Sequence, residues 1–341
     1  MKKELKLHIE NGIKISNFYF GGGTPTILLD ELLEFIDILK DNFDVKKISL
    51  ETTLREIDNK NIDLLKNAGI NRLSVGIQSF DNKVLKSMGR LTLTGEQAKE
   101  KLRMIQGQFD TVNIDFIFNF PSQTIDNFWN DIKTFKNMGI DQATFYPMMP
   151  SPNKLNALER KFKWIDTSRE LDFYNILVKE LYEKGYKAST VWCFSRGDMM
   201  IDEYIIDFDD YIGIGASALS FLKGNFYVNT FSLDRYDKII SSGKLPVVLL
   251  RKLSEKEHVQ YYMLTKLFGM KIDHKNFLRR FQNDIYRKLK LELMFLKAFG
   301  LVEDNGQINV TPKGMYAVSV MMKEFFAGLN KLRENCIEKR I

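Results

Sequence analysis

The 341-residue sequence has few cysteines and no long apolar run. Cys193 and Cys336 are the only cysteines, and because they lie far apart without CxxC spacing, we expect neither a shared disulfide nor a shared metal site. We interpret them as reduced thiols of a cytoplasmic protein. The apolar runs are much shorter than a bilayer span, so we expect no membrane-spanning helix. The start, Met-Lys-Lys-Glu, lacks the apolar core of a signal peptide and gives no indication of export.

A strong excess of one charge is also missing. The chain has 50 Lys and Arg against 44 Asp and Glu, a net charge of +6, and its charges alternate in sign in segments such as residues 154–163. This pattern is typical of a solvated surface, so we expect no nucleic-acid partner, although acidic small molecules would be attracted.

What the sequence does contain is a regular alternation of short apolar strands and amphipathic helices. After a helix in residues 1–12, strands are predicted at residues 17–20, 47–51, 72–78, 112–118 and 142–147, followed in turn by helices at 28–42, 61–68, 95–106, 125–138 and 167–185. Five successive βα units require parallel strands joined by right-handed crossovers. We therefore predict an α/β barrel or an open doubly wound sheet.

The first predicted strand runs directly into three glycines. Gly21, Gly22 and Gly23 have no Cβ, so this turn can adopt positive φ and bring backbone N–H groups close to a ligand. Thr24 and Thr26 add hydroxyl groups beside that backbone. The alternative interpretation is a tight βα turn without a ligand.

Polar residues follow the ends of the next strands. Each of them alone could be a helix cap, a salt-bridge partner or a surface residue. A barrel would bring them to one mouth, because the carboxyl ends of parallel strands lie at the same face. Carboxylates, an amide, a guanidinium and free N–H groups together suit a zwitterionic nucleoside. The residues concerned are Glu51, Gln78, Arg90 and Asp115, together with Gly22 and Gly23.

Four motifs, in their order and spacing, resemble the radical S-adenosylmethionine (SAM) family of oxygen-independent coproporphyrinogen III oxidases. They are FGGGTPT at residues 20–26, ETTLREID at 51–58, NRLSVGIQSF at 71–80 and NIDFIFNFP at 113–121. YIGIGASALS at 211–220 and YVNT at 227–230 are similar to the segment that follows the family's barrel. The resemblance implies an α/β fold: a partial (β/α)6 radical SAM barrel lacking its first strand in residues 1–245, and a mainly α-helical, winged-helix-like domain in residues 246–341.

The resemblance also implies a set of cofactor-binding residues. In the family, the glycine motif holds the methionyl amine of SAM, which corresponds here to Gly22, Gly23 and Thr24. Cofactor-contacting positions further correspond to Glu51, Gln78, Arg90 and Asp115, while Met149 and Leu219 match backbone or apolar contacts to the adenosine part.

One family motif has no counterpart in this sequence. Family members hold a [4Fe-4S] cluster with a CxxxCxxC loop, and Cys193 and Cys336 cannot provide three ligands at that spacing. Residues 1–12 match the helix that follows the loop. We therefore expect either a chain truncated at its N-terminus or a paralogue without the cluster.

The function implied by the resemblance is that of a radical SAM oxidoreductase acting on a tetrapyrrole, by porphyrinogen oxidative decarboxylation or in anaerobic heme utilisation, with an electron donor as partner. The alternative is a non-catalytic, heme-chaperone-like tetrapyrrole-binding protein. Residues 144–152 and 191–196, rich in Met, Pro and aromatics, could contact such a substrate or simply pack the barrel. Residues 246–341 also fit a DNA-binding winged helix, but Glu292 beside the basic residues Arg287, Lys288 and Lys290 argues against nucleic acid.

Overall fold

The computed structural model describes residues 1–341 except 164, 201–205, 207, 340 and 341. Its chain divides into two compact units. The first, which we call the parallel-sheet unit, comprises residues 14–148 and 158–202, and the second unit comprises residues 1–13, 149–157 and 203–341. Each unit is described by itself.

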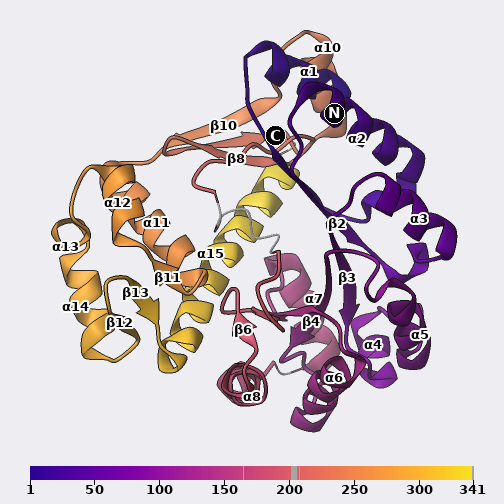
Figure 1. Ribbon diagram of the computed structural model, residues 1–341, viewed down its shortest axis with the longest axis vertical. Helices are drawn as coiled ribbons and strands as arrows, with labels where there is room; N and C mark the ends of the chain where they lie inside the picture. The colour runs from indigo at the N-terminus through magenta and orange to yellow at the C-terminus, as the bar shows by residue number, and fades with distance from the viewer. Residues whose placement is uncertain (164, 201–205, 207, 340–341) are drawn as a thin grey trace. The chain divides into compact units, whose positions relative to one another are not determined.

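The parallel-sheet unit contains a seven-stranded sheet in the order β1-β2-β3-β4-β5-β7-β6. The predicted alternation of strands and helices is confirmed, and Figure 1 shows helices α2 to α6 along the outer side of the sheet. The strands are β1 (Asn17–Phe20), β2 (Lys47–Thr52), β3 (Arg72–Gln78), β4 (Thr111–Phe118), β5 (Gln142–Pro147), β6 (Lys187–Ala188) and β7 (Cys193–Ser195). The helices are η1 (Pro25–Leu28), α2 (Leu29–Asn42), η2 (Leu54–Glu56), α3 (Asn59–Asn67), α4 (Asn82–Met88), α5 (Gly95–Ile105), α6 (Ile125–Met138), α8 (Glu170–Glu180) and η3 (Tyr182–Lys184). The mixed-charge segment 154–163 lies almost entirely in helix α7 (Pro152–Phe162), whose residues belong partly to one unit and partly to the other.

The far end of the sheet departs from an all-parallel barrel. Strands β1 to β5 are parallel, but β7 pairs antiparallel with both β5 and β6. The reason is a tight reversal between β6 and β7, where the Thr190 hydroxyl accepts hydrogen bonds from the N–H groups of Trp192 and Cys193, each at 3.0 Å. Among the described residues no ladder joins β1 to β6, so the sheet is open.

One face of the sheet forms the apolar core. Side chains alternate between the two faces of a strand, and the positions that face the helices are fully buried and apolar, including Leu50, Leu73 and Ile114. Phe116 stacks on Phe145 with ring centroids 4.9 Å apart, and Phe128 of α6 meets Phe145 edge-on at 5.8 Å. The opposite face of the same strands is therefore available for polar side chains.

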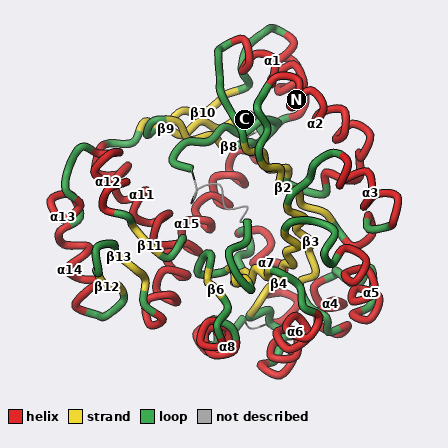
Figure 2. The backbone as a smooth tube through the Cα atoms, in the orientation of Figure 1, coloured by secondary structure: helices red, strands yellow, loops and turns green. Residues whose placement is uncertain are grey.

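The second unit is mainly helical and has two small sheets, of which β8, β9 and β10 are visible side by side in Figure 2. A buried carboxylate connects its first helix to this sheet: Glu4 accepts hydrogen bonds from Gly215 N (2.8 Å), Asn229 Nδ2 (2.7 Å) and the Tyr236 hydroxyl (2.5 Å). The elements are α1 (Lys2–Glu10), β8 (Leu219–Leu222), β9 (Asn225–Asn229), α10 (Leu233–Ser241), β10 (Val247–Lys252), α11 (Glu255–Phe268), β11 (Lys271–Ile272), α12 (His274–Phe281), α13 (Ile285–Lys288), α14 (Lys290–Ala298), β12 (Val302–Asp304), β13 (Ile308–Val310) and α15 (Pro312–Glu338).

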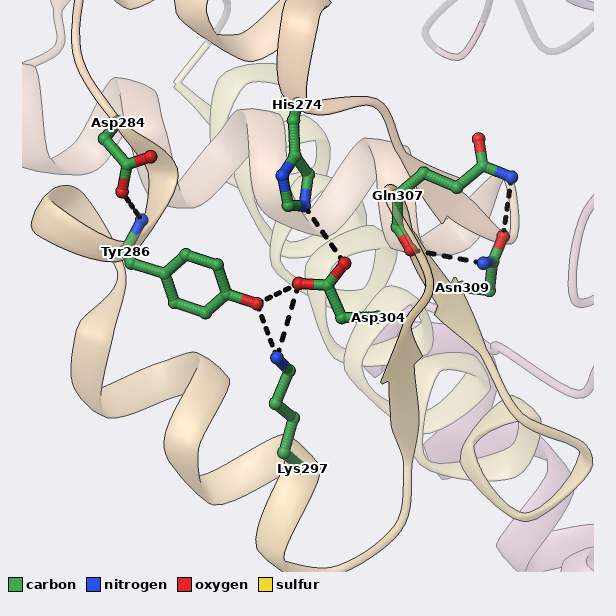
Figure 3. Close-up of polar contacts among 7 residues, drawn as sticks. All are labelled: His274, Asp284, Tyr286, Lys297, Asp304, Gln307 and Asn309. Atoms are coloured by element: carbon green, nitrogen blue, oxygen red, sulfur yellow. Dashed lines mark hydrogen bonds and ion pairs between the residues drawn. The ribbon is translucent and has the colours of Figure 1, made fainter.

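The predicted winged-helix-like pattern lies in residues 255–338, where the hairpin β12–β13 packs with α14 and α15, and β11, which pairs with β13, packs with α11. Figure 3 shows the polar cluster that holds this hairpin: Tyr286 donates to Asp304, Lys297 donates to both, and His274 Nε2 lies 3.5 Å from Asp304 Oδ1. Burial opposes the charge of Asp304, yet the bonds from Tyr286 and Lys297 hold its pKa below the usual value. Tyr286, Lys297 and Asp304 satisfy one another's hydrogen bonds, so we assign the cluster a structural role.

Within the part of the chain that the structure describes, no helix combines the length and the hydrophobicity needed to cross a membrane.

Candidate functional site

The sheet face opposite the helices carries two layers of polar side chains. The layer at the amino ends of the strands is centred on Arg72, which is fully buried. Its Nε and Nη2 donate to Gln142 Oε1 at 2.9 and 2.7 Å, and Gln142 Nε2 in turn donates to Ser195 Oγ at 2.9 Å. The buried polar side chains of this layer therefore have hydrogen-bond partners in one another.

The second layer lies nearer the carboxyl ends of the strands and contains Asp115. Its two carboxylate oxygens accept from Ser74 Oγ at 3.0 Å and from Asn113 Nδ2 at 2.8 Å. Asn113 also donates to Ser74 Oγ at 2.8 Å and accepts from Thr144 Oγ1 at 3.0 Å. These bonds fix the Asp115 carboxylate in one orientation on β4, where it remains half-buried and not sealed in the core.

Glu51 continues this layer on β2. It is the register partner of Ser74 in the β2–β3 ladder, so Glu51, Ser74 and Asp115 lie on three neighbouring strands. The Tyr19 hydroxyl of β1 donates to the Glu51 carboxylate. A continuous polar row therefore crosses the first four strands of the sheet.

The glycine turn lies at the end of β1 beside this row. Gly22 has a φ of +87°, and a Cβ added at Gly22 or Gly23 would meet nothing within 4 Å. The turn is anchored behind the glycines by Thr26, whose buried hydroxyl pairs with that of Thr52 at 2.7 Å. Thr24 precedes the short helix η1 and makes no capping bond with its side chain. The backbone of the predicted corner is thus open and positioned by the end of β2.

Gln78 ends β3 in a left-handed conformation, with a φ of +69°. Its side chain folds back over Gly76, where an added Cβ would lie 3.0 Å from Gln78 Nε2. The loop that follows is held by Asp131 of α6, which accepts from Ser79 Oγ and Phe80 N, each at 2.7 Å. Burial raises the pKa of Asp131 to about 7, although both of these bonds favour the charged form.

The remaining predicted site residues do not belong to the first four strands of the sheet. Arg90 follows the left-handed cap Gly89 of α4 and is exposed, with no side-chain hydrogen bond or ion pair to any residue that the structure describes. Met149 and Leu219 lie in the second unit, whereas the other seven predicted residues lie in the parallel-sheet unit.

Several residues of this second layer were not among the predicted site residues: Tyr19, Ser74, Asn113 and Thr144. The signal that identifies them is the two-residue period of the strands. Polar side chains recur at every second position, as in Asn113 and Asp115, while the intervening positions are apolar.

The residues present do not fit a [4Fe-4S] cluster. Cys193 lies in β7 of the parallel-sheet unit and Cys336 in α15 of the second unit, and both are buried cysteines outside any disulfide. Among the described residues, no group of three or more His, Cys, Asp or Glu side chains is placed to hold a metal ion. We therefore derive no chemical step from a cluster.

Comparisons with known proteins identify a family and relatives for the chain. Residues 1–150 match the model of the radical SAM superfamily. The chain is 26% identical to the heme chaperone HemW of Lactococcus lactis over 326 residues, which cover 92% of this chain and 85% of that protein. It is 25% identical to the oxygen-independent coproporphyrinogen III oxidase of Helicobacter pylori over 360 residues, covering 96% and 78% of the two chains.

Among solved structures, the chain is similar to coproporphyrinogen III oxidase (HemN) from Escherichia coli, a radical SAM enzyme. The TM-score is 0.76 with 23% sequence identity, over 94% of this chain and 82% of that one. This similarity confirms the predicted α/β fold with its C-terminal helical part.

Proposed function

We propose that this chain, which carries a radical SAM domain in residues 1–150 and is related to HemW heme chaperones and coproporphyrinogen III oxidases, binds SAM and acts on a tetrapyrrole in heme metabolism. The observation that carries the proposal is the polar row of Glu51, Ser74 and Asp115 beside the open glycine turn. In parallel α/β sheets, ligands bind at the carboxyl ends of the strands.

In this proposal each group has a defined task. The exposed backbone at Gly22 and Gly23 receives the methionyl end of SAM, because no side chain blocks it. The carboxylates of Glu51 and Asp115 accept hydrogen bonds from hydroxyl or ammonium groups of the cofactor. Ser74 and Asn113 act as positioning residues, since they orient Asp115. When bound, SAM would supply its adenosyl group, which is attached to a sulfonium centre.

We also propose the class of reaction and its setting. The oxidase relatives support an oxidoreductase that acts on a tetrapyrrole. We infer an electron donor as its partner and the cytoplasm as its setting, where cysteines such as Cys193 and Cys336 stay reduced. A second candidate function is a non-catalytic tetrapyrrole-binding protein, which is favoured by the lack of three suitably spaced thiolates in these 341 residues. A tetrapyrrole titration followed by visible absorption, with and without SAM, distinguishes the two: a binding protein would need no SAM.

We predict that Asp115→Asn weakens SAM binding. A hydrogen bond to a charged group contributes roughly 1.5–3 kcal/mol, so the substitution should raise Kd by about ten-fold or more. The replacement keeps the shape of the side chain and removes its charge. Isothermal titration calorimetry of SAM into the 341-residue chain measures the effect.

Glu96→Gln provides the matched control. Glu96 lies in the first turn of α5 in the same unit, is exposed and pairs only with Lys99 among the described residues, so its substitution should leave Kd unchanged. If Asp115→Asn binds SAM as tightly as the control variant, the polar row is not the cofactor site.

We further predict that the 341-residue chain alone does not assemble a [4Fe-4S] cluster. After anaerobic reconstitution with iron and sulfide, its visible spectrum should equal that of a Cys193→Ser, Cys336→Ser double variant, because neither thiol has two thiolate neighbours. Stoichiometric iron and sulfide in the wild-type chain, lost in the double variant, would contradict this prediction and make both cysteines candidate ligands.

A further inference from the structure

Tyr19 is the one aromatic residue of β1 that faces the polar row. Phe18 and Phe20, its two neighbours, point to the helix side, where their rings lie 5.7 Å from Phe43 and 6.1 Å from Phe35. Because side chains alternate along a strand, Tyr19 is directed to the opposite face, which also carries Glu51.

The Tyr19 side chain lies across the glycine turn. A Cβ added at Gly21 would be 2.5 Å from the Tyr19 hydroxyl oxygen and 2.7 Å from its ring carbon Cε1, so only glycine allows this arrangement. From this position the hydroxyl donates to the Glu51 carboxylate. The side chain is 36% exposed, so it is held on one side by the glycine and is open to solvent on the other.

We propose that Tyr19 is a displaceable cap on the nucleoside site, whose hydroxyl occupies Glu51 until a ligand replaces it. This inference rests on the proposed function, because it assigns Glu51 to the cofactor. The phenol supplies the same kind of group, a neutral O–H donor, that a ribose hydroxyl would bring to the carboxylate. A ligand that reaches Glu51 past Gly21 must move the Tyr19 ring, and only molecules in the uncapped state bind.

The cap therefore lowers the apparent affinity for SAM, which equals the affinity of the uncapped protein multiplied by the fraction of molecules in the uncapped state. Tyr19→Phe keeps the ring and removes the hydroxyl that anchors it. We expect this variant to bind SAM roughly ten-fold more tightly than the wild type, since the competing bond to a charged group is lost. A side chain that contacts the ligand or merely supports the fold would produce the opposite sign or no change.

The experiment is a double-mutant cycle measured by calorimetry with SAM. It compares wild type, Tyr19→Phe, Glu51→Gln and the double variant. The gain from Tyr19→Phe should disappear in the Glu51→Gln background, because the cap acts through that carboxylate. Tyr182→Phe is the control: Tyr182 lies in the same unit, and its hydroxyl makes no hydrogen bond among the described residues.

The outcomes separate this inference from the function on which it rests. If the wild type binds SAM and Tyr19→Phe binds equally or more weakly, the cap is refuted and the proposed function stands. If the gain persists in the Glu51→Gln background, the cap does not act through Glu51 and is likewise refuted. If neither wild type nor Tyr19→Phe binds SAM up to its solubility limit, both proposals fail.

Discussion

Replacing Gly314 with alanine should destabilise the second unit by about 3 kcal/mol or more, the upper end of the range for overpacked cores. Gly314 is buried near the start of α15, and a Cβ at this position would lie 1.9 Å from the carbonyl oxygen of Leu301 and 2.7 Å from its carbonyl carbon. These are backbone atoms, and the same oxygen accepts a hydrogen bond from Thr311 N at 3.0 Å. The clash can be relieved only by moving α15 away from the hairpin β12–β13.

The same helix provides a control of opposite sign. Gly328 is exposed, and a Cβ there would meet nothing within 4 Å. Gly328→Ala should therefore stabilise the unit by about 0.5–1 kcal/mol, because glycine in a helix interior costs conformational entropy. Urea denaturation of both variants followed by circular dichroism tests the pair. Equal midpoints for Gly314→Ala and Gly328→Ala would show that α15 does not pack on Leu301 as described.

The elements that the sequence predicted well are those with a strong local pattern. Strand β1 and helix α6 match their predicted bounds because glycine, proline and capping residues mark their ends, such as Thr124 before α6 and Gly139 after it. The short helix α4 was not predicted, although its N-cap Asp81 and its left-handed Gly89 are both local signals. Its seven residues present too short an apolar period to identify a helix.

The sequence predicted those candidate site residues whose position depends only on the strand end that they follow. Glu51 and Asp115 follow from the parallel order of β2 and β4, since parallel strands present their carboxyl ends at one face. The Tyr19–Glu51 bond does not follow, because it depends on a ring lying across Gly21 from a neighbouring strand. The antiparallel direction of β7 was not predicted for a similar reason: it is set by hydrogen bonds to one side chain, Thr190.

Asp131 should make the stability of the parallel-sheet unit fall as pH rises from about 4 to 7. Its carboxyl is 1% exposed, and burial raises its pKa from 3.8 to about 7. Between these pH values the folded chain holds a proton that the unfolded chain has released. Each pH unit of increase therefore lowers the free energy of unfolding by up to about 1.4 kcal/mol, and the whole window lowers it by roughly 4 kcal/mol. The penalty is complete above pH 7 and absent below pH 4.

Asp131→Asn should remove this dependence. An amide can accept from Phe80 N through its oxygen and donate to Ser79 Oγ, so the loop after Gln78 keeps both of its anchors without a buried charge. We expect the variant to exceed the wild type in unfolding free energy at pH 8 and to approach it at pH 4. The control is Asp126→Asn, an exposed carboxylate in the first turn of the same helix, which should shift the whole curve by a few tenths of a kcal/mol at most. Urea titrations at pH 4, 6 and 8 measure all three proteins. Parallel curves for Asp131→Asn and the wild type would mean that Asp131 is ionised in the folded chain throughout this range, and that the bonds from Ser79 and Phe80 outweigh its burial.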